Sequence, residues 1–274
     1  MAHTQGGWFG RATALLRGRG ERPRRALEGR RVLVSGSSGS IGSAIAGRLA
    51  GEGARVALHY HSGAAAAEAL AARINAGGGP PRAFTVQGRL DRQAEAGQVF
   101  AGACALLGGV DVLVNCVGFS RDDSILMLSE GDADAVMRGN LGPVVYLCEA
   151  MRRQGGHVDA GRIVNITSIT GLVGQPMRAL YGAAKGGVIA YTKSLAREIA
   201  AQGWTANCIA PQVVEGGLAE RMKPAAQAMI GGVTPVRRTC LPDDLTGAAL
   251  FLASADSGFV TGTVMNVTGG LVTW

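Results

Sequence analysis

The stretch RVLVSGSSGSIGSAIAGRLA, residues 31–50, joins an apolar, β-branched run to a turn rich in glycine and serine and then to an alanine-rich segment. This order predicts a strand, a tight loop and a helix. Gly36, Gly39 and Gly42 fall at offsets of zero, three and six, whereas the dinucleotide fingerprint G-x-G-x-x-G has glycines at zero, two and five. Backbone N–H groups and the helix N-terminus can bind a phosphate in such a loop. A glycine-rich turn alone is weak evidence for a nucleotide site.

The rest of the chain repeats this alternation of short apolar runs and alanine-rich segments. Seven runs are strand candidates, at residues 31–36, 55–60, 83–88, 111–118, 162–168, 205–211 and 263–270. Runs that are apolar throughout are typical of strands covered on both faces. The order predicts an α/β fold, a Rossmann-like, doubly wound sheet of seven parallel strands with helices on both faces. Ligands bind such sheets outside the carboxyl ends of the strands.

The N-terminal segment differs in composition from the rest of the chain. The 274 residues carry a net charge of +7, of which residues 1–25, with six arginines and one glutamate, contribute +5. We expect residues 1–28 to be a disordered Arg/Gly-rich extension, because such a composition buries little apolar area. A transit peptide or a weak membrane-surface helix is the alternative. Residues 29–274 are expected to form a single, nearly neutral domain, which argues against nucleic-acid binding.

Cysteine usage and hydropathy indicate the compartment. The five cysteines, at positions 104, 116, 148, 208 and 240, are odd in number and form no C-x-x-C pair, which is typical of reduced thiols rather than of disulfides or zinc ligands. No uncharged apolar run approaches the roughly 18 residues of a membrane span. We therefore expect a cytoplasmic protein. No metal site is expected, because His59 and His61 share a strand face without a nearby Cys, Asp or Glu.

Three polar residues near the fifth strand candidate form a candidate catalytic group. Ser168 ends that strand, and Tyr181 and Lys185 are four residues apart, so on a helix they share a face. A tyrosine with a pKa of about 10 is a poor acid at neutral pH, and an ammonium beside it favours the phenolate. The ordinary alternative for Y-x-x-x-K is a surface tyrosine beside a solvated lysine.

Six segments in order resemble the motifs of the short-chain dehydrogenase/reductase family over residues 29–274. They are SGSSGSIG (35–42), NCVG (115–118), RGNLGP (138–143) with Asn140, Ser168, YGAAK (181–185) and IAPQ (209–212). Within the family, LVNCVGFSRDDSILMLS (113–129), AKGGVIAYTKSLAREIA (184–200) and PVRRTCLPDDLTGAALFLAS (235–254) are most similar to the 3-oxoacyl-[acyl-carrier-protein] reductases.

The resemblance implies an NADPH-dependent reduction and a role for each of four residues. Tyr181 would protonate the carbonyl oxygen, Ser168 would hold that oxygen, Lys185 would bind the nicotinamide ribose and lower the pKa of the tyrosine, and Asn140 would hold a water in the proton relay. With Tyr181 and Lys185, the residues expected to contact the cofactor are Gly36, Ser38, Gly39, Ser40, Ile41, Gly42, Tyr60, His61, Ser62, Arg89, Leu90, Asn115, Val117, Gly118, Pro211, Gln212 and Val214.

The cofactor preference follows from the end of the second strand. NAD-preferring relatives carry an acidic residue there, whereas this chain has Tyr60, so NADPH is favoured over NADH. Several positions depart from the family pattern around the cofactor. Ser40, a candidate helix N-cap, replaces a loop glycine, and Gln212 and Gly216 replace a glycine and a threonine. Arg89 either supplies charge near a 2'-phosphate or is a surface residue.

The same resemblance suggests partners. Residues 213–232, VVEGGLAERMKPAAQAMIGG, would form a substrate lid, and Met222, Met229 and Ile230 favour an apolar acyl chain. A carrier protein is acidic, and relatives present arginines to it where this chain has Asp159 and Gln202. The candidates to compensate are Arg152, Arg153, Arg162 and Arg197. We also expect a homotetramer or homodimer.

Two other functions stay open at this point. The first is a short-chain reductase or dehydrogenase that acts on a free ketone, alcohol, sugar or steroid. The second is a catalytically weak nucleotide-binding sensor or assembly partner, for which the departures around the cofactor argue and the four intact catalytic residues argue against.

Overall fold

In a computed structural model, the described residues are 25–154, 158, 160–217 and 224–273. The strands are β1 (Arg31–Ser35), β2 (Arg55–Tyr60), β3 (Ala83–Gln87), β4 (Val112–Asn115), β5 (Arg162–Ile166), β6 (Thr205–Pro211) and β7 (Val264–Val267). The helices are α2 (Ser40–Gly51), α3 (Ala64–Asn75), α4 (Gln93–Leu107), α5 (Glu130–Asn140), α6 (Gly142–Gln154), α7 (Thr170–Val173), α8 (Ala179–Ile199), α9 (Pro224–Val233) and α10 (Thr246–Ala253). Each strand lies within one of the seven expected apolar runs.

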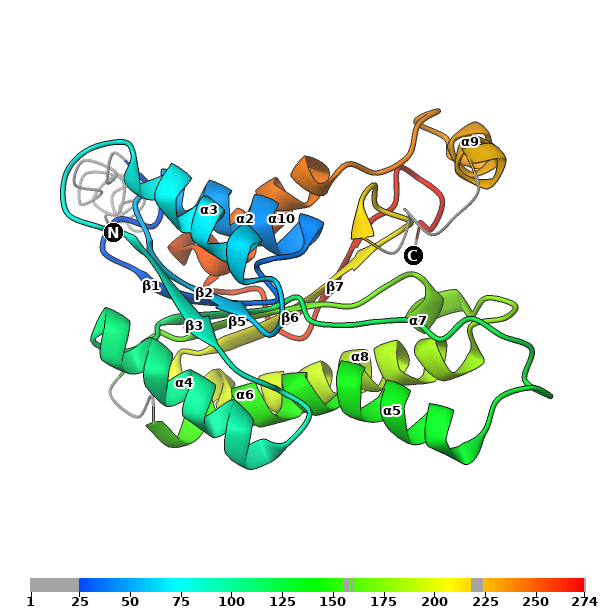
Figure 1. Ribbon diagram of the computed structural model, residues 1–274, viewed down its shortest axis with the longest axis horizontal. Coiled ribbons are helices and arrows are strands. Elements are labelled where there is room, and N and C mark those ends of the chain that lie inside the picture. Colours follow the sequence, from blue (N-terminus) through cyan, green and yellow to red (C-terminus); the bar gives the residue numbers. More distant parts are fainter. Residues whose placement is uncertain (1–24, 155–157, 159, 218–223, 274) are drawn as a thin grey trace, which may run out of the picture.

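The strands form one parallel sheet in the order β3-β2-β1-β4-β5-β6-β7. The helices α2, α3 and α10 cover one face of the sheet, and α4, α5, α6 and α8 cover the other (Figure 1). The expected Rossmann-like, doubly wound fold is therefore confirmed. Strand order reverses between β1 and β4, and the carboxyl ends at this switch point are where such sheets bind ligands.

Each face of the sheet buries its own apolar core. The core under α4, α6 and α8 includes Phe100, Leu147 and Ile163, and the core under α2 and α10 includes Ile45 and Leu252, all almost fully buried. Because both faces are covered, strands such as β4 and β6 are buried at every position.

The packed domain begins a few residues before the expected boundary at residue 29. The expected N-terminal extension lies outside the described residues as far as position 24. Leu27 is fully buried in the core under α2, and its N–H donates to the carbonyl of Glu52 at 3.0 Å. The boundary is hard to find from the sequence because a single leucine follows an arginine-rich stretch.

A buried arginine at the amino end of β5 joins several elements. The guanidinium of Arg162 donates to the carbonyls of Ser254, after α10, and of Gly203, after the 3-10 turn η1 (Ala200–Gln202) that extends α8, both at 3.2 Å. A third bond, of 3.1 Å, goes to Gly161. Burial, and then the charge of Arg30, lowers the pKa of Arg162. The expectation that Arg162 offers positive charge to a carrier protein is wrong, because it is buried and occupied.

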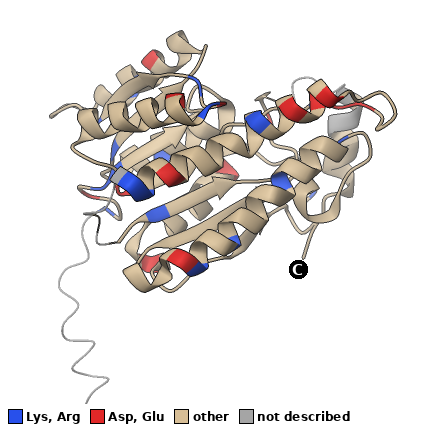
Figure 2. Ribbon diagram, turned by 90° about the horizontal axis from the view of Figure 1, so that it is seen from below, with Lys and Arg blue, Asp and Glu red and all other residues tan. Residues whose placement is uncertain are grey.

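Arg152 and Arg153, two of the other basic residues expected to compensate, lie near the same end of the sheet. Arg152 stacks on the ring of Trp204 at 4.9 Å, and Arg153 pairs with Glu149 on α6. Figure 2 shows basic and acidic residues interspersed along this helical layer. Ser168 lies beyond the other end of β5, so these arginines are remote from the candidate active site.

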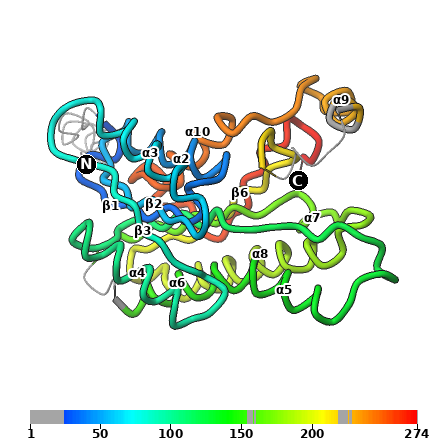
Figure 3. Tube along the Cα trace, viewed as in Figure 1, coloured from blue at the N-terminus to red at the C-terminus, as the bar shows by residue number. Residues whose placement is uncertain are grey.

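Two properties expected from composition can be compared with the described part of the chain. Its five cysteines are all free. No helix within the described ranges is both long enough and apolar enough to cross a membrane. Figure 3 traces the path of the chain, with α2, α3 and α10 on one side of the sheet and α4, α5, α6 and α8 on the other.

Candidate active site

The loop after β1 packs tightly against the first turn of α2. Gly36 has a φ of +67°, a conformation that favours glycine, and the N–H of Gly39 donates to its carbonyl at 3.1 Å. A Cβ on Gly42 would lie 2.8 Å from the carbonyl carbon of Gly36. The loop thus leaves the first-turn N–H groups of α2 facing outward, where a phosphate can bind.

Ser40 is not the helix N-cap that its sequence position suggests. Gly39 occupies the N-cap, without a side-chain cap bond, and Ser40 is the first residue of α2. The glycine at position 39 shifts the start of the helix by one residue, so the Ser40 hydroxyl cannot serve the capping role.

Two cavities meet at the carboxyl ends of β1 and β4. The first has a volume of about 360 Å³ and contains the loop after β1 together with Ser168, Tyr181 and Lys185. The second, of about 420 Å³, extends toward the ends of β2 and β3. Gly36, Gly39, Cys116 and Gly118 line both. A glycine cradle between two connected cavities fits an extended dinucleotide, with its pyrophosphate at the N-terminus of α2.

Most residues expected to contact the cofactor line these cavities. The first cavity has Gly36, Gly39, Ser40, Ile41, Gly42, Gly118, Tyr181, Lys185, Pro211, Gln212 and Val214. The second has Gly36, Ser38, Gly39, His61, Ser62, Arg89, Leu90, Val117 and Gly118. Cofactor contact itself stays a prediction for every one of them.

Tyr60 and Asn115 are buried elsewhere and line neither of the two cavities. Asn115 extends into the helical layer below the sheet, where its Nδ2 donates to Asn165 Oδ1 at 2.8 Å. Asn165 donates in turn to Thr192 on α8 at 2.8 Å. The side chain of Asn115 therefore links β4 to β5 and α8, and supports the site from below.

Arg89 is exposed at the mouth of the second cavity and is occupied by acidic neighbours. Its guanidinium contacts Asp91 at 2.6 and 3.0 Å and Glu95 at 3.7 Å. The surface interpretation of Arg89 is the one that this geometry favours, because the two carboxylates balance its charge.

His59 is a site residue whose role the sequence does not indicate. Its imidazole is buried, with Nδ1 accepting from the N–H of Gly36 and Nε2 lying by the carbonyl of Gly88, both at 3.1 Å. This pattern requires a neutral ring with its proton on Nε2. Burial lowers the pKa of His59 to about 4. His61 lies beyond the end of β2 and is exposed, so the two histidines do not share a strand face as expected.

Tyr181 and Lys185 lie on the buried face of α8. Lys185 Nζ lies 5.8 Å from the centroid of the Tyr181 ring and donates to the carbonyl of Ile166 at 3.0 Å. Burial lowers the pKa of Lys185 to about 8. The helix thus presents a hydroxyl and an ammonium one turn apart, and neither is the solvated surface group that the ordinary alternative requires.

The surroundings of Tyr181 raise its pKa. Burial has the largest effect and raises it, a hydrogen bond with Ser168 and the charge of Arg178 lower it, and the charge of Asp122 raises it. Burial of the phenol outweighs the favourable interactions with Ser168 and Arg178, and the expected lowering by Lys185 stays a prediction. The Tyr181 phenol is protonated at neutral pH, as an unperturbed tyrosine also is.

Ser168 follows β5 and lies beside the Tyr181 hydroxyl. Its Oγ accepts from the N–H of Thr170 at 3.2 Å and lies 3.3 Å from Thr170 Oγ1. Thr170 Oγ1 in turn contacts Gln175 Oε1 at 3.2 Å. The local turn therefore fixes the serine hydroxyl at the wall of the first cavity.

Asn140 is fully buried at the end of α5, behind Gly118. Its Nδ2 donates to the carbonyls of Phe119 and Val136, both at 2.9 Å, and its Oδ1 accepts from the N–H of Phe119 at 3.2 Å. A Cβ on Gly118 would lie 2.7 Å from Asn140 Oδ1 and 3.1 Å from Lys185 Nζ. Glycine at 118 thus lets the two side chains approach. The expected role of Asn140 in holding a water stays a prediction.

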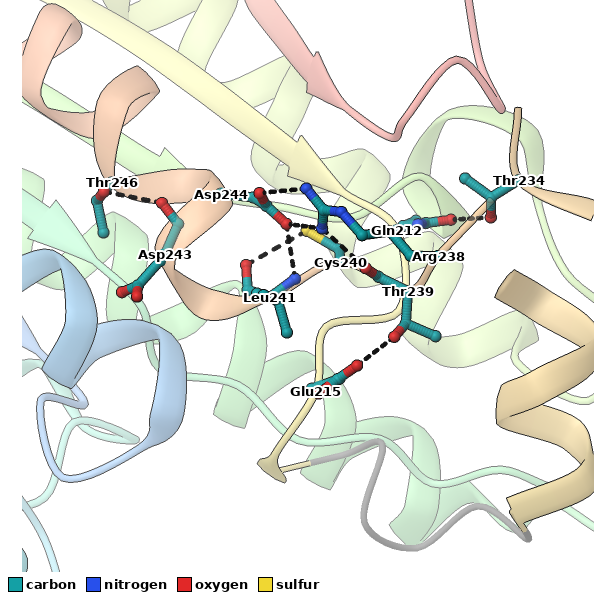
Figure 4. Close-up of polar contacts among 10 residues, drawn as sticks. All are labelled: Gln212, Glu215, Thr234, Arg238, Thr239, Cys240, Leu241, Asp243, Asp244 and Thr246. Atoms are coloured by element: carbon teal, nitrogen blue, oxygen red, sulfur yellow. Dashed lines mark hydrogen bonds and ion pairs between the residues drawn. The ribbon is translucent and has the colours of Figure 1, made fainter. Parts of the chain in front are cut away.

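The segment expected to form a lid is anchored at both ends. Gln212, just before the segment, accepts a hydrogen bond from Thr234, just after it, at 3.1 Å (Figure 4). Val214 forms a β-bridge with Cys240. Close by, Arg238 and Asp244 form an ion pair in which Nη2 of Arg238 lies 2.8 Å from Oδ1 of Asp244.

Between these anchors only part of the expected apolar lining is present. Ile230 and Val233 of α9 line the first cavity, whereas Met229 is 68% exposed, so its expected role is not supported by its position. Met222 lies outside the described residues.

Metal binding finds no support in the described ranges of the chain. No group of three or more His, Cys, Asp or Glu side chains there could hold an ion. The cavity walls instead present a phenol hydroxyl, an ammonium and a glycine-rich loop.

Comparisons with known proteins agree with this geometry. A family model described as enoyl-(acyl carrier protein) reductase matches residues 36–272. The nodulation protein G of Rhizobium sp. (strain N33) is 36% identical over 245 residues, which cover 89% of this chain and 98% of that protein. A 3-oxoacyl-[acyl-carrier-protein] reductase of Synechocystis sp. is 36% identical over 248 residues, covering 90% and 98%.

A solved structure shows the same architecture. A protein described as a gluconate dehydrogenase, from Agrobacterium tumefaciens, superposes with a TM-score of 0.84 at 30% identity, covering 90% of this chain and 98% of its own. The sheet order, the glycine loop, the Tyr181–Lys185 pair and these likenesses agree: the chain belongs to the short-chain dehydrogenase/reductase family and is an oxidoreductase.

Proposed function

We propose that this chain reduces the keto group of a 3-oxoacyl thioester, carried by an acyl carrier protein, to the 3-hydroxyacyl thioester, with NADPH as the reductant. The observation that carries the proposal is the buried Tyr181, which lines the first cavity together with Ser168 and with Lys185, one helical turn away. The Synechocystis relative, a 3-oxoacyl-[acyl-carrier-protein] reductase, supports the substrate class.

In the proposed reduction, Tyr181, Ser168 and Lys185 each have a separate role. The bound cofactor supplies a hydride to the carbonyl carbon of the substrate. Tyr181, whose phenol is protonated at neutral pH, donates its proton to the carbonyl oxygen. Ser168 donates a hydrogen bond to the same oxygen and stabilises its developing charge. The Lys185 ammonium would hold the ribose hydroxyls of the nicotinamide cofactor.

NADPH is the proposed cofactor because β2 ends without an acidic side chain. Tyr60 is the last residue of β2, and the second cavity beyond it contains His61, Ser62 and Arg89. The second cavity also contains the carboxylate of Asp91, but this carboxylate is paired with Arg89. Comparison of KM values for NADPH and NADH tests this preference, and a lower KM for NADH would contradict it.

The assay for the proposed reaction follows NADPH oxidation with acetoacetyl thioesters, first of a small thiol and then of a carrier protein. We expect Tyr181→Phe to lower turnover by a factor of about 100 or more, because a general acid is lost. Tyr191→Phe is the matched control, since Tyr191 lies on the same helix and lines neither of the two cavities described above. Turnover that survives in Tyr181→Phe would remove the acid role.

A second candidate function keeps the chemistry and changes the substrate. The structural likeness to proteins described as a gluconate dehydrogenase and a short-chain alcohol dehydrogenase favours a free ketone or alcohol. Reduction of an unrelated ketone without reduction of either thioester would support it. Tight NADPH binding without turnover of any substrate would instead indicate a nucleotide-binding sensor or assembly partner.

The proposed setting is a cytoplasmic homotetramer or homodimer. Light scattering at micromolar concentration tests the assembly, and a monomer would contradict it.

A further inference from the structure

The first cavity has further polar lining residues, none of which was expected as a site residue from the sequence. The side chain of Arg178, 15% exposed, lies three residues before Tyr181 and lines the cavity with Gln175 and Thr170. Its Nε donates to Asp122 at 2.9 Å and its Nη2 contacts the same carboxylate oxygen at 2.8 Å. Asp122 comes from the segment between β4 and α5, which joins α8 here.

The backbone on both sides of this ion pair is fixed. Met177, just before Arg178, has a φ of +66°, which is uncommon for a residue with a side chain. Its carbonyl accepts from the N–H of Asp123 at 2.8 Å. Residues held in such conformations cluster at functional sites. The strained turn sets the direction in which Arg178 leaves the N-terminus of α8.

The guanidinium retains donors for a ligand. Asp122 accepts from Nε and Nη2, and Gln175 Oε1 accepts from Nη1 at 3.4 Å. A guanidinium has five N–H groups, so two remain after these three contacts. Arg178 also reaches the reacting centre electrostatically, because its charge and that of Asp122 act in opposite directions on the Tyr181 hydroxyl.

We propose that the Arg178 guanidinium binds the second carbonyl oxygen of the substrate, the thioester C=O, while Ser168 and Tyr181 bind the keto oxygen. This inference rests on the proposed function and assigns to Arg178 the selection of substrates that carry a thioester beside the keto group. A 3-oxoacyl thioester has two carbonyls one carbon apart, so it can contact both walls of the cavity. Because Asp122 compensates the charge of Arg178, the pair offers a strong donor without a net charge, which suits a neutral thioester better than a free 3-oxo acid.

Three substrates separate this role from a structural one: an acetoacetyl thioester of a small thiol, free acetoacetate, and a simple ketone with a single carbonyl. We expect Arg178→Met to raise the KM for the thioester by about tenfold or more, because a charge-assisted hydrogen bond is lost. Its kcat/KM for the simple ketone should fall much less than that for the thioester, because the simple ketone has no second carbonyl for Arg178 to bind. Arg178→Lys, which keeps a donor but not the fork, should fall between.

Asp122→Asn provides an independent readout. Loss of the compensating charge should raise the ratio of kcat/KM for acetoacetate to that for the thioester by about tenfold, since Arg178 then carries a net charge. Arg138→Gln is the matched control, because Arg138 is paired with Asp134 on the exposed side of α5 and lines neither described cavity.

The outcomes are distinct. An equal loss for the thioester and the simple ketone in Arg178→Met, or no loss for either, would overturn the inference while the proposed function stands. If the ratio of kcat/KM for acetoacetate to that for the thioester is unchanged in Asp122→Asn, the charge argument is overturned. This test remains available if Arg178→Met does not fold. If the wild-type protein reduces no thioester, the proposed function fails and this inference with it.

Discussion

The Nδ1 atom of His59 accepts a hydrogen bond from the N–H of Gly36 at 3.1 Å, so a side chain at the end of β2 holds the turn that follows β1. The other ring nitrogen lies 3.1 Å from the carbonyl of Gly88 after β3. One neutral imidazole therefore ties together three strand ends that surround the second cavity. Protonation of Nδ1 would break the bond to Gly36, because a protonated nitrogen cannot accept.

Acid should destabilise the protein through His59. Its pKa is lowered from 6.5 to about 4 in the fold, so between these values the unfolded chain binds more protons. Stability is therefore lost as the pH falls from 6.5 to 4, by at most about 3 kcal/mol from this residue. Urea unfolding at several pH values measures this. His59→Asn should flatten the acid limb, and the exposed control His61→Asn should not; equal slopes for all three proteins would contradict the prediction.

Lys185→Met should abolish reduction and stabilise the fold at pH 7. Burial lowers the pKa of Lys185 from 10.5 to about 8, so at neutral pH the fold bears a charge in an unfavourable place. We expect a gain of about 1–3 kcal/mol, reduced by the unpaired carbonyl of Ile166.

The pH dependence of this gain distinguishes it from better packing. Between pH 8 and 10.5 the wild-type lysine is neutral when folded and charged when unfolded, so wild-type stability rises relative to the variant. The difference between the two proteins should shrink over this range in denaturant titrations. A gain that is constant from pH 7 to 10 would show that the charge is not its cause.

Gly42→Ala should weaken both stability and NADPH binding. The new Cβ would meet the backbone carbonyl of Gly36, which cannot move without changing the glycine-rich turn after β1. We expect a loss of about 1–3 kcal/mol in unfolding free energy and a higher Kd for NADPH. Gly47→Ala in the same helix is the control, because no described atom outside the local helix backbone lies within 4 Å of its Cβ. That variant should be more stable by about 0.5–1 kcal/mol.

Gly118→Ala should impair turnover more than folding. The added methyl group would push apart Asn140 Oδ1 and Lys185 Nζ, which are side-chain atoms and can shift. We expect kcat to fall about tenfold or more, since small displacements of catalytic groups are costly. Gly97→Ala on α4, where no described neighbour lies within 4 Å beyond the helix itself, should leave kcat unchanged. Steady-state kinetics beside thermal melts make the comparison.

The fold could be predicted from the sequence because its signal is local. Strands β2 and β6 match the expected runs residue for residue, and the alternation with helices determined the parallel order. Tyr181, Lys185 and Ser168 could be found because their spacing on one helix and at one strand end is fixed by the chain itself.

The rest depended on contacts between distant parts of the chain. Arg178 pairs with a residue 56 positions away, and His59 bridges Gly36 and Gly88, which lie 23 and 29 positions from it. In the sequence, Arg162 cannot be distinguished from an exposed arginine. Its burial depends on the fold, which brings three backbone carbonyls to its guanidinium. The raised pKa of Tyr181 likewise depends on burial, which a four-residue spacing does not reveal.

Arg162 has a consequence for the geometry of catalysis. Its bond to Gly203 restrains one end of α8, and Tyr181 lies near the other end of this 21-residue helix. At 1.5 Å per residue the helix is a lever of about 30 Å, so a rotation of one degree about its anchored end displaces the tyrosine by about 0.5 Å. Arg162, which contacts neither of the two cavities, therefore helps to fix the position of Tyr181, the proposed proton donor.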